Sequence, residues 1–173
     1  MRINVRGIIV EIRRPLSISQ EPDEIILPLA LDRLIAVPRL PDGYHKRAYE
    51  HSDGQEVRTL LSKCGFVFTE KQYTSVLRLC VPNGVHILID SQTDQVVSVM
   101  MSRHLSRDDF LFGGRIDWLA TDPRHRGRRL GETVACMATH HLRNIGYENI
   151  WVTTQKNRAD ALKIFHKIGF RKP

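Results

Sequence analysis

The most constraining feature of the chain is a run of three predicted strands that leads directly into a long amphipathic helix. The strand segments are "VHILID" (85–90), "VVSVMMSRH" (96–104) and "GRIDWLAT" (114–121), all rich in β-branched and apolar residues and separated by a turn or a loop. Residues 128–147 then carry apolar side chains at helical spacing until Gly146. A strand meander followed by such a helix predicts a layered α/β fold.

The remaining segments extend this order to β-α-α-β-β-β-α-β-α. They are a strand at 44–50, helices at 52–65 and 69–80, a strand at 149–154 and a helix at 158–170. The segment "PNG" (82–84) is expected to stop the helix at 69–80. The sequence therefore predicts a mixed, mainly antiparallel central sheet flanked by helices.

The N-terminal part of the chain is predicted to form an additional β-hairpin. Residues 3–14 and 24–37 are rich in Ile and Val, and the segment between them carries turn residues. The stretch "PRLPDGY" (38–44) then interrupts the pattern with two prolines and a glycine. We therefore expect an N-terminal hairpin appendage at 1–40 and a main domain at 44–173.

Positive charge is concentrated in the last third of the chain. The whole protein of 173 residues has a formal net charge of +7. Residues 1–109 hold 14 Lys and Arg against 14 Asp and Glu, whereas residues 110–173 hold 12 against 5. The excess therefore surrounds the stretch "RHRGRRLG" (124–131), which indicates one local anion site rather than a generally basic surface.

The 124–131 stretch has the composition of a phosphate-binding turn. A strand, a tight turn containing Pro123 and Gly127, and a helix opening near Leu130 would expose backbone N–H groups at the positive end of a helix dipole. Arginine side chains would add charge-assisted hydrogen bonds to phosphate oxygens. The stretch matches neither a Walker loop nor the dinucleotide pattern G-x-G-x-x-G.

The segment "LATDPRHRGRRLGETV" resembles the acyl-CoA-binding motif Q/R-x-x-G-x-G/A of the GNAT acetyltransferase superfamily. Arg124 matches the first motif position and Gly127 the fourth, while Arg129 replaces the usual Gly or Ala and Gly131 follows two places later. The segment "NRADALKIFHKIGF" (157–170) is similar to the closing signature of that family, with Phe165 in place of its tyrosine. The element order from about residue 45 to 170 also fits, so the resemblance covers about three-quarters of the chain.

The resemblance implies a GNAT-like fold with acetyl-CoA as cosubstrate and no metal. Backbone N–H groups in the 126–131 range would then hold the coenzyme's pyrophosphate, and a short strand segment would pair with its pantetheine arm. The implied coenzyme-binding residues are Leu119, Ala120, Thr121, Arg124, Arg126, Gly127, Arg128, Arg129, Leu130, Gly131 and Asn157.

The implied reaction is direct acetyl transfer to an amine, which must lose a proton before it attacks the thioester. Asp117, on the strand before the arginine stretch, is the first candidate base, and the other candidates are His104, Asp108 and Asp109. Phe165 stands where the family has its tyrosine acid and has no proton to donate. The resemblance thus predicts an N-acetyltransferase, with a weakly catalytic or non-catalytic acyl-CoA sensor as the alternative.

Other partners and sites are less well supported by the sequence. Nucleic acid is disfavoured because the charge is clustered at a glycine turn rather than spread as a stripe. Adjacent His140 and His141 point in different directions on a helix and cannot chelate a metal together. No apolar run approaches the length of a membrane span, and three unpaired cysteines are typical of a cytoplasmic protein. A homodimer formed through the N-terminal hairpin is left open.

Overall fold

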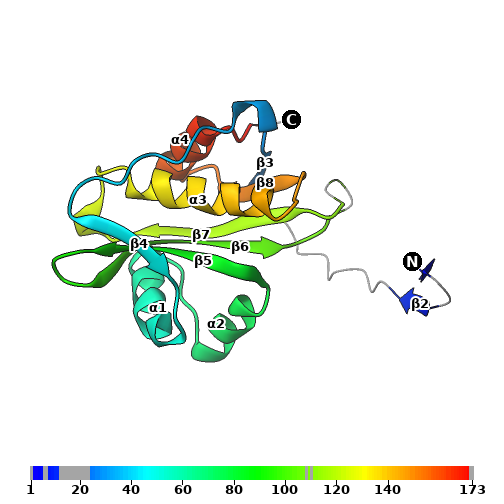
Figure 1. Cartoon of the computed structure of the whole chain (residues 1–173), viewed down its shortest axis with the longest axis horizontal. Coiled ribbons are helices and arrows are strands. Elements are labelled where there is room, and N and C mark those ends of the chain that lie inside the picture. The colour runs from blue at the N-terminus through cyan, green and yellow to red at the C-terminus, as the bar shows by residue number, and fades with distance from the viewer. Residues whose placement is uncertain (1, 6–7, 12–23, 108, 110, 172–173) are drawn as a thin grey trace.

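The computed structural model describes residues 2–5, 8–11, 24–107, 109 and 111–171 (Figure 1). Its centre is a six-stranded sheet in the order β3-β8-β7-β6-β5-β4. The strands are β3 (Glu24–Pro28), β4 (Tyr44–Ala48), β5 (Cys80–Asp90), β6 (Gln95–His104), β7 (Gly114–Thr121) and β8 (Ile150–Gln155). Only β7 and β8 pair in parallel, and the other neighbours are antiparallel. The predicted mixed, mainly antiparallel sheet is therefore confirmed.

Helices cover both faces of this sheet (Figure 1). One face carries α1 (Gly54–Lys63) and α2 (Glu70–Leu77), and the other carries α3 (Leu130–Asn144) and α4 (Ala159–Ile168). Three short 3-10 helices are η1 (Leu31–Arg33), η2 (His51–Asp53) and η3 (Pro123–His125). Eight of the ten residues of β6 are buried, because each face of this central strand packs against one helical layer.

The core is accordingly divided into two clusters by the sheet. On the α3 side, Met100 and Ile116 pack with Leu142 of α3 and Phe165 of α4. On the α1 side, Val99 and Met101 pack with Leu61 and Tyr73. The alternation of Val99, Met100 and Met101 between the two clusters follows from the two-residue period of a strand.

An N-terminal β-hairpin is present, as the sequence predicts, but its strands are not the predicted segments 3–14 and 24–37. β1 (Arg2–Val5) pairs with β2 (Ile8–Glu11), and β3 pairs antiparallel with β8 at the edge of the main sheet. Leu27 and Leu29 are buried in the core on the α3 side, which a two-stranded hairpin alone would not provide. The division of the chain at residue 40 stays a prediction, but β3 belongs with the main sheet.

The "PNG" segment is a second difference from the sequence prediction. α2 already ends at Leu77, and β5 runs from Cys80 through Pro82 to Gly84 with a shift of register before Val85. A Cβ added to Gly84 would lie 2.4 Å from the Ser102 carbonyl oxygen of the neighbouring strand. The segment is therefore an irregularity inside a strand, where glycine permits close backbone approach.

Candidate active site

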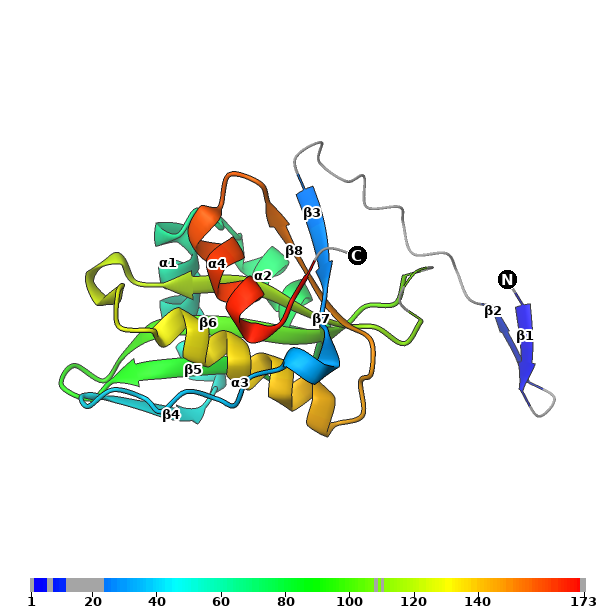
Figure 2. The same cartoon turned by 90° about the horizontal axis from the view of Figure 1, so that it is seen from above.

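The parallel strands β7 and β8 separate soon after they begin. Their pairing covers only Gly114–Ile116 against Ile150–Val152, and the strands then diverge toward their C-terminal ends (Figure 2). A cavity of about 290 Å³ occupies the opening, lined by both strands, by α4 and by the loop after α1. We call it the β7–β8 cavity. Such an opening between strand ends is where parallel sheets commonly bind ligands.

β7 carries a β-bulge beside this cavity. Val99 of β6 pairs with Ala120, whereas Met101 pairs with Asp117, so β7 has one residue more than β6 in this interval. Trp118 lies there with a positive φ of 57°. Trp118 and Leu119 line the β7–β8 cavity as a result, which is the kind of local redirection that bulges produce.

The segment after β7 forms a tight loop that ends at the N-terminus of α3, and we call it the 122–131 loop. Asp122 begins η3 by accepting a hydrogen bond from the Arg124 backbone N–H at 2.9 Å. Gly127 has a φ of +75° and Arg129 a φ of +60°, and α3 starts at Leu130. The predicted sequence of strand, glycine turn and helix is confirmed.

The arginine side chains of the 122–131 loop are exposed, and three of the four bond to partners in the fold. Arg124 donates to Asp122 at 3.1 Å and Arg129 donates to buried Glu132 at 2.7 Å. Arg128 donates to the Tyr44 hydroxyl at 2.5 Å. These bonds fix the shape of the loop while each guanidinium keeps further N–H donors for an anion.

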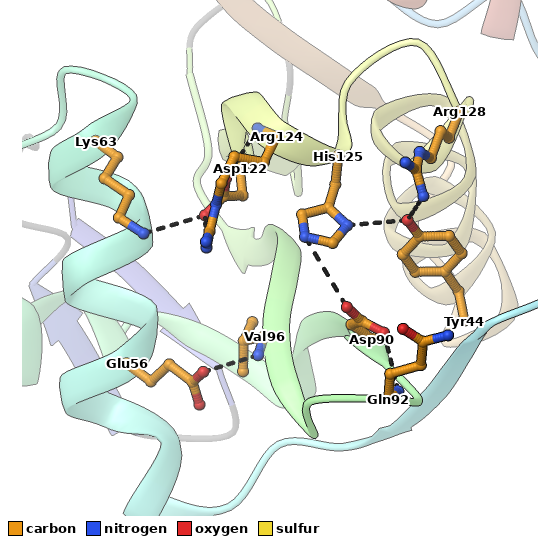
Figure 3. A network of polar contacts seen from close by, with 10 residues as sticks. All are labelled: Tyr44, Glu56, Lys63, Asp90, Gln92, Val96, Asp122, Arg124, His125 and Arg128. Carbon is orange, nitrogen blue, oxygen red and sulfur yellow. Dashed lines mark hydrogen bonds and ion pairs between the residues drawn. The ribbon is translucent and has the colours of Figure 1, made fainter.

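A chain of polar contacts ties the 122–131 loop to β4 and β5 (Figure 3). The Tyr44 hydroxyl lies 2.9 Å from Nδ1 of His125, whose Nε2 lies 4.0 Å from Asp90. Because Arg128 can only donate, the Tyr44 oxygen accepts from it and can donate its own O–H to His125 Nδ1. A neutral His125 in that tautomer carries its proton on Nε2, the nitrogen nearer Asp90. Neither Tyr44 nor His125 was expected at this site, since no local pattern links residues so distant in sequence.

The loop is held from the other side by α1. Lys63 bonds to Asp122 at 3.1 Å, and the Asp122 side chain is only 5% exposed. Hydrogen bonds from the Arg124 guanidinium, from its backbone N–H and from Lys63 hold the pKa of Asp122 well below its usual range. Asp122 is thus an ionised anchor for a loop with excess positive charge.

We expect Asp122→Asn to lower the free energy of unfolding most strongly at pH 7. A lowered folded-state pKa stabilises the fold fully above the unfolded pKa of about 4, and this contribution is lost as the pH falls further. The difference between wild type and variant in urea unfolding should therefore shrink below about pH 4. Asp160→Asn, an exposed site on α4, is the control and should change little. A difference that stays constant from pH 7 to pH 3 would contradict the role of Asp122.

Asp117 lies on the β7–β8 cavity but is bound on both sides. Its carboxylate is 5% exposed and accepts from Arg103 at 2.5 Å and from Arg115 at 2.6 Å. Both oxygens are therefore engaged by guanidinium groups, which does not leave one oriented to take a proton from an amine. The structure places the predicted base in an ion-pair cluster instead.

Two of the alternative bases, His104 and Asp109, are not among the residues that line the cavity. His104 Nδ1 lies 3.0 Å from the Tyr147 hydroxyl at an exposed position. Asp109 is 74% exposed and lies 3.8 Å from Arg107. Asp108 lies outside the described residues.

Phe165 lies in the second half of α4. Its ring is buried, lines the β7–β8 cavity and packs edge-to-face on Phe170 with centroids 5.9 Å apart. Asn157 is exposed in the turn between β8 and α4. Ala120, Leu130 and Gly131 are buried.

Two kinds of site were not found in the described part of the chain. Within it, no three His, Cys, Asp or Glu side chains gather in a way that could hold a metal ion. None of the described helices has the length and apolar character needed to cross a membrane.

Comparison with known proteins places this geometry in context. Residues 54–170 match the sequence profile described as the acetyltransferase (GNAT) family. A mycothiol acetyltransferase of Mycobacteroides abscessus is 27% identical over 90 residues, which cover 51% of this chain and 29% of that protein. The chain therefore spans less than a third of this relative.

Solved structures show the same fold at low sequence identity. A GCN5-related N-acetyltransferase from Sphaerobacter thermophilus has a TM-score of 0.67 and 13% identity, covering 86% of this chain and 47% of that chain. The ribosomal-protein-S18-alanine N-acetyltransferase of Escherichia coli has a TM-score of 0.60 and 16% identity, covering 75% and 79%.

Proposed function

Because the chain belongs to the acetyltransferase (GNAT) family, we propose that it transfers an acetyl group from acetyl-CoA directly to an amine. The observation that carries this proposal is the β7–β8 cavity, which lies where these two strands diverge, with the glycine turn and the N-terminus of α3 following β7 in the chain. The relatives named above acetylate different acceptors by their descriptions, so they support the reaction and not one acceptor.

Acetyl-CoA would lie along the opening between the strands. Its pantetheine arm would pair with the backbone of Leu119 to Thr121, as an added strand does at a sheet edge. Its pyrophosphate would bind the N–H groups of residues 126–131, assisted by the α3 dipole and by the arginines. Acetyl-CoA supplies the thioester carbon that the amine attacks.

The chain's own residues would position this reaction rather than supply a strong acid. The bulged backbone near Leu119 would donate a hydrogen bond to the thioester oxygen as it gains charge. The neutral amine nitrogen bonds to the carbonyl carbon, the carbon–sulfur bond breaks, and the proton that the nitrogen loses passes through water to the leaving thiolate. Phe165 packs beside this centre without a transferable proton, and a thiol of pKa about 8.5 can leave unassisted.

We expect Phe165→Tyr to maintain or raise kcat for acetyl transfer. The added hydroxyl would give the leaving thiolate a proton donor at little cost in volume, although it needs a hydrogen-bond partner when buried. Wild-type turnover should rise with pH as the amine deprotonates and then level off, since no tyrosine acid titrates near pH 10. Phe170→Tyr, one ring away and outside the cavity lining, is the control.

Steady-state rates between pH 6 and 10 test this expectation. A variant that folds and binds acetyl-CoA normally but loses more than tenfold in kcat would contradict it. A steep alkaline fall in the wild-type rate would show that another side-chain acid takes part.

Calorimetry with acetyl-CoA, followed by measurement of thiol release over a panel of amines, tests the proposed function. We expect saturable binding and amine-dependent release of CoA. Binding without release on any amine, in both wild type and Phe165→Tyr, would favour an acyl-CoA sensor. Absence of binding would reject both functions.

A further inference from the structure

The rim of the β7–β8 cavity holds an arginine whose charge is not balanced by the acidic side chain of the cavity. Arg158 lies in the turn after β8, just before α4, and lines the cavity. On the basis of the proposed acetyl transfer, we infer that the acceptor amine carries an oxyanion group, a carboxylate or a phosphate, that binds Arg158.

The charge distribution of the cavity supports an anionic ligand. Its charged lining residues are Arg115, Asp117 and Arg158. The Asp117 carboxylate already accepts from the guanidinium groups of Arg103 and Arg115. Over the ranges that the structure describes, no acidic side chain lies within ion-pair distance of Arg158. A cation beside a partly enclosed cavity favours a ligand of opposite charge.

The guanidinium of Arg158 lies over an aromatic ring. Its guanidinium carbon lies 4.4 Å from the centroid of the Phe66 ring. Stacking on an aromatic ring uses the face of the planar guanidinium, while its N–H groups point outward in the plane. That edge matches the two oxygens of a carboxylate or phosphate. Phe66 thus holds Arg158 in place without using its donors.

The contact between Arg158 and Phe66 joins two segments over the cavity. Phe66 belongs to the loop after α1, whereas Arg158 belongs to the turn between β8 and α4. Gly65, with a φ of +87°, adjoins the contact, and a Cβ added there would lie 3.7 Å from Nη2 of Arg158. That distance is an ordinary van der Waals contact, so the positive φ rather than a lack of space favours glycine at this junction.

The coenzyme's phosphates do not account for this arginine. In the proposed function they bind at the 122–131 loop, whereas the Arg158 cavity is also lined by Leu119 and Phe165, where the thioester would lie. The thioester end of acetyl-CoA has no phosphate. An oxyanion near Arg158 must then belong to the acceptor, and the α4 N-terminus adds favourable potential for it.

Pairs of amines that differ only in the anion test this inference. Calorimetry, with and without CoA, would compare the members of each pair. The carboxylate pairs are α-amino acids and their carboxamides. The phosphate pairs are phosphoethanolamine with ethanolamine, and glucosamine 6-phosphate with glucosamine. We expect at least tenfold tighter binding of the anionic members, and the same preference in kcat/KM for CoA release. The carboxylate and phosphate pairs distinguish the two oxyanions.

Substitutions then assign the preference to Arg158. Arg158→Gln should lower the affinity for the anionic amine at least tenfold and leave the KM for acetyl-CoA unchanged. Arg158→Lys should retain part of the affinity for the anionic amine. Lys156→Gln, an exposed site in the same turn, is the charge-matched control.

Three results would overturn the inference. They are equal binding of both members of every pair, binding of no amine at all, and an Arg158→Gln variant that raises the KM for acetyl-CoA instead. Failure of the proposed function is recognised separately, because amine binding is also measured without CoA. A protein that selects anionic amines by Arg158 yet transfers no acetyl group would retain the anion site and lose the proposed reaction.

Discussion

Asp117→Ala is expected to destabilise the folded protein by about 3–5 kcal/mol, because it leaves buried charges without their partner. The Arg103 and Arg115 side chains are only 10% and 14% exposed, and both bond to this carboxylate. Removing it places two guanidinium groups close together in a poorly hydrated position. Urea unfolding monitored by circular dichroism measures the loss.

Asp109→Ala is the matched control for this prediction. Asp109 is 74% exposed and lies 3.8 Å from Arg107, so its loss should cost about 0–1 kcal/mol. If Asp117→Ala unfolds like wild type but has lost its amine-dependent turnover, Asp117 acts on the acceptor and the ion-pair role is wrong. Equal stability and activity would exclude both roles.

Gly127→Glu is expected to weaken acetyl-CoA binding at least tenfold, about 1.4 kcal/mol. It places a carboxylate where the coenzyme's pyrophosphate should approach the loop. A Cβ at Gly127 meets nothing within 4 Å, so the side chain fits without a clash and the fold should persist. Its positive φ of 75° adds backbone strain for any residue with a side chain. Calorimetry with acetyl-CoA gives the affinity.

Gly146→Glu is the control that distinguishes the effect of a carboxylate at the 122–131 loop from the effects of backbone strain and of a changed net charge. Gly146 also has a positive φ, of 99°, and open space around it, but it lies just beyond the opposite end of α3. This variant should bind acetyl-CoA as wild type does. If Gly127→Glu folds normally and keeps its full affinity, the pyrophosphate does not bind at the 122–131 loop.

The elements with strong local signals were predictable from the sequence. Gly114–Thr121 was predicted and observed as the same strand, since a mainly apolar segment is bounded there by a glycine and by the turn at Pro123. The glycine turn before α3 was predicted for a similar reason, because Pro123 and Gly127 end the strand pattern and a helical period begins near Leu130.

The contacts made by distant segments were not predictable. Asp117 was interpreted as a base because the sequence indicates its strand and the arginine stretch that follows. Its partner Arg103 is distant in sequence and reaches it only through the pairing of β6 with β7. The contact of Tyr44 with His125 depends on how β4 is brought beside the loop. The misplaced hairpin has the same origin, because β-propensity does not identify a strand's partner.

The position of β3 also bears on how the protein is made. During synthesis β3 leaves the ribosome well before its partner β8, and Leu27 pairs with Val152 only after the intervening strands and α3 exist. Pairing of such separated segments carries a large loop-closure cost and is slow. Until it occurs, β8 would be an open edge that can recruit other chains. The edge next to the proposed coenzyme cleft should therefore be the last part of the sheet to form.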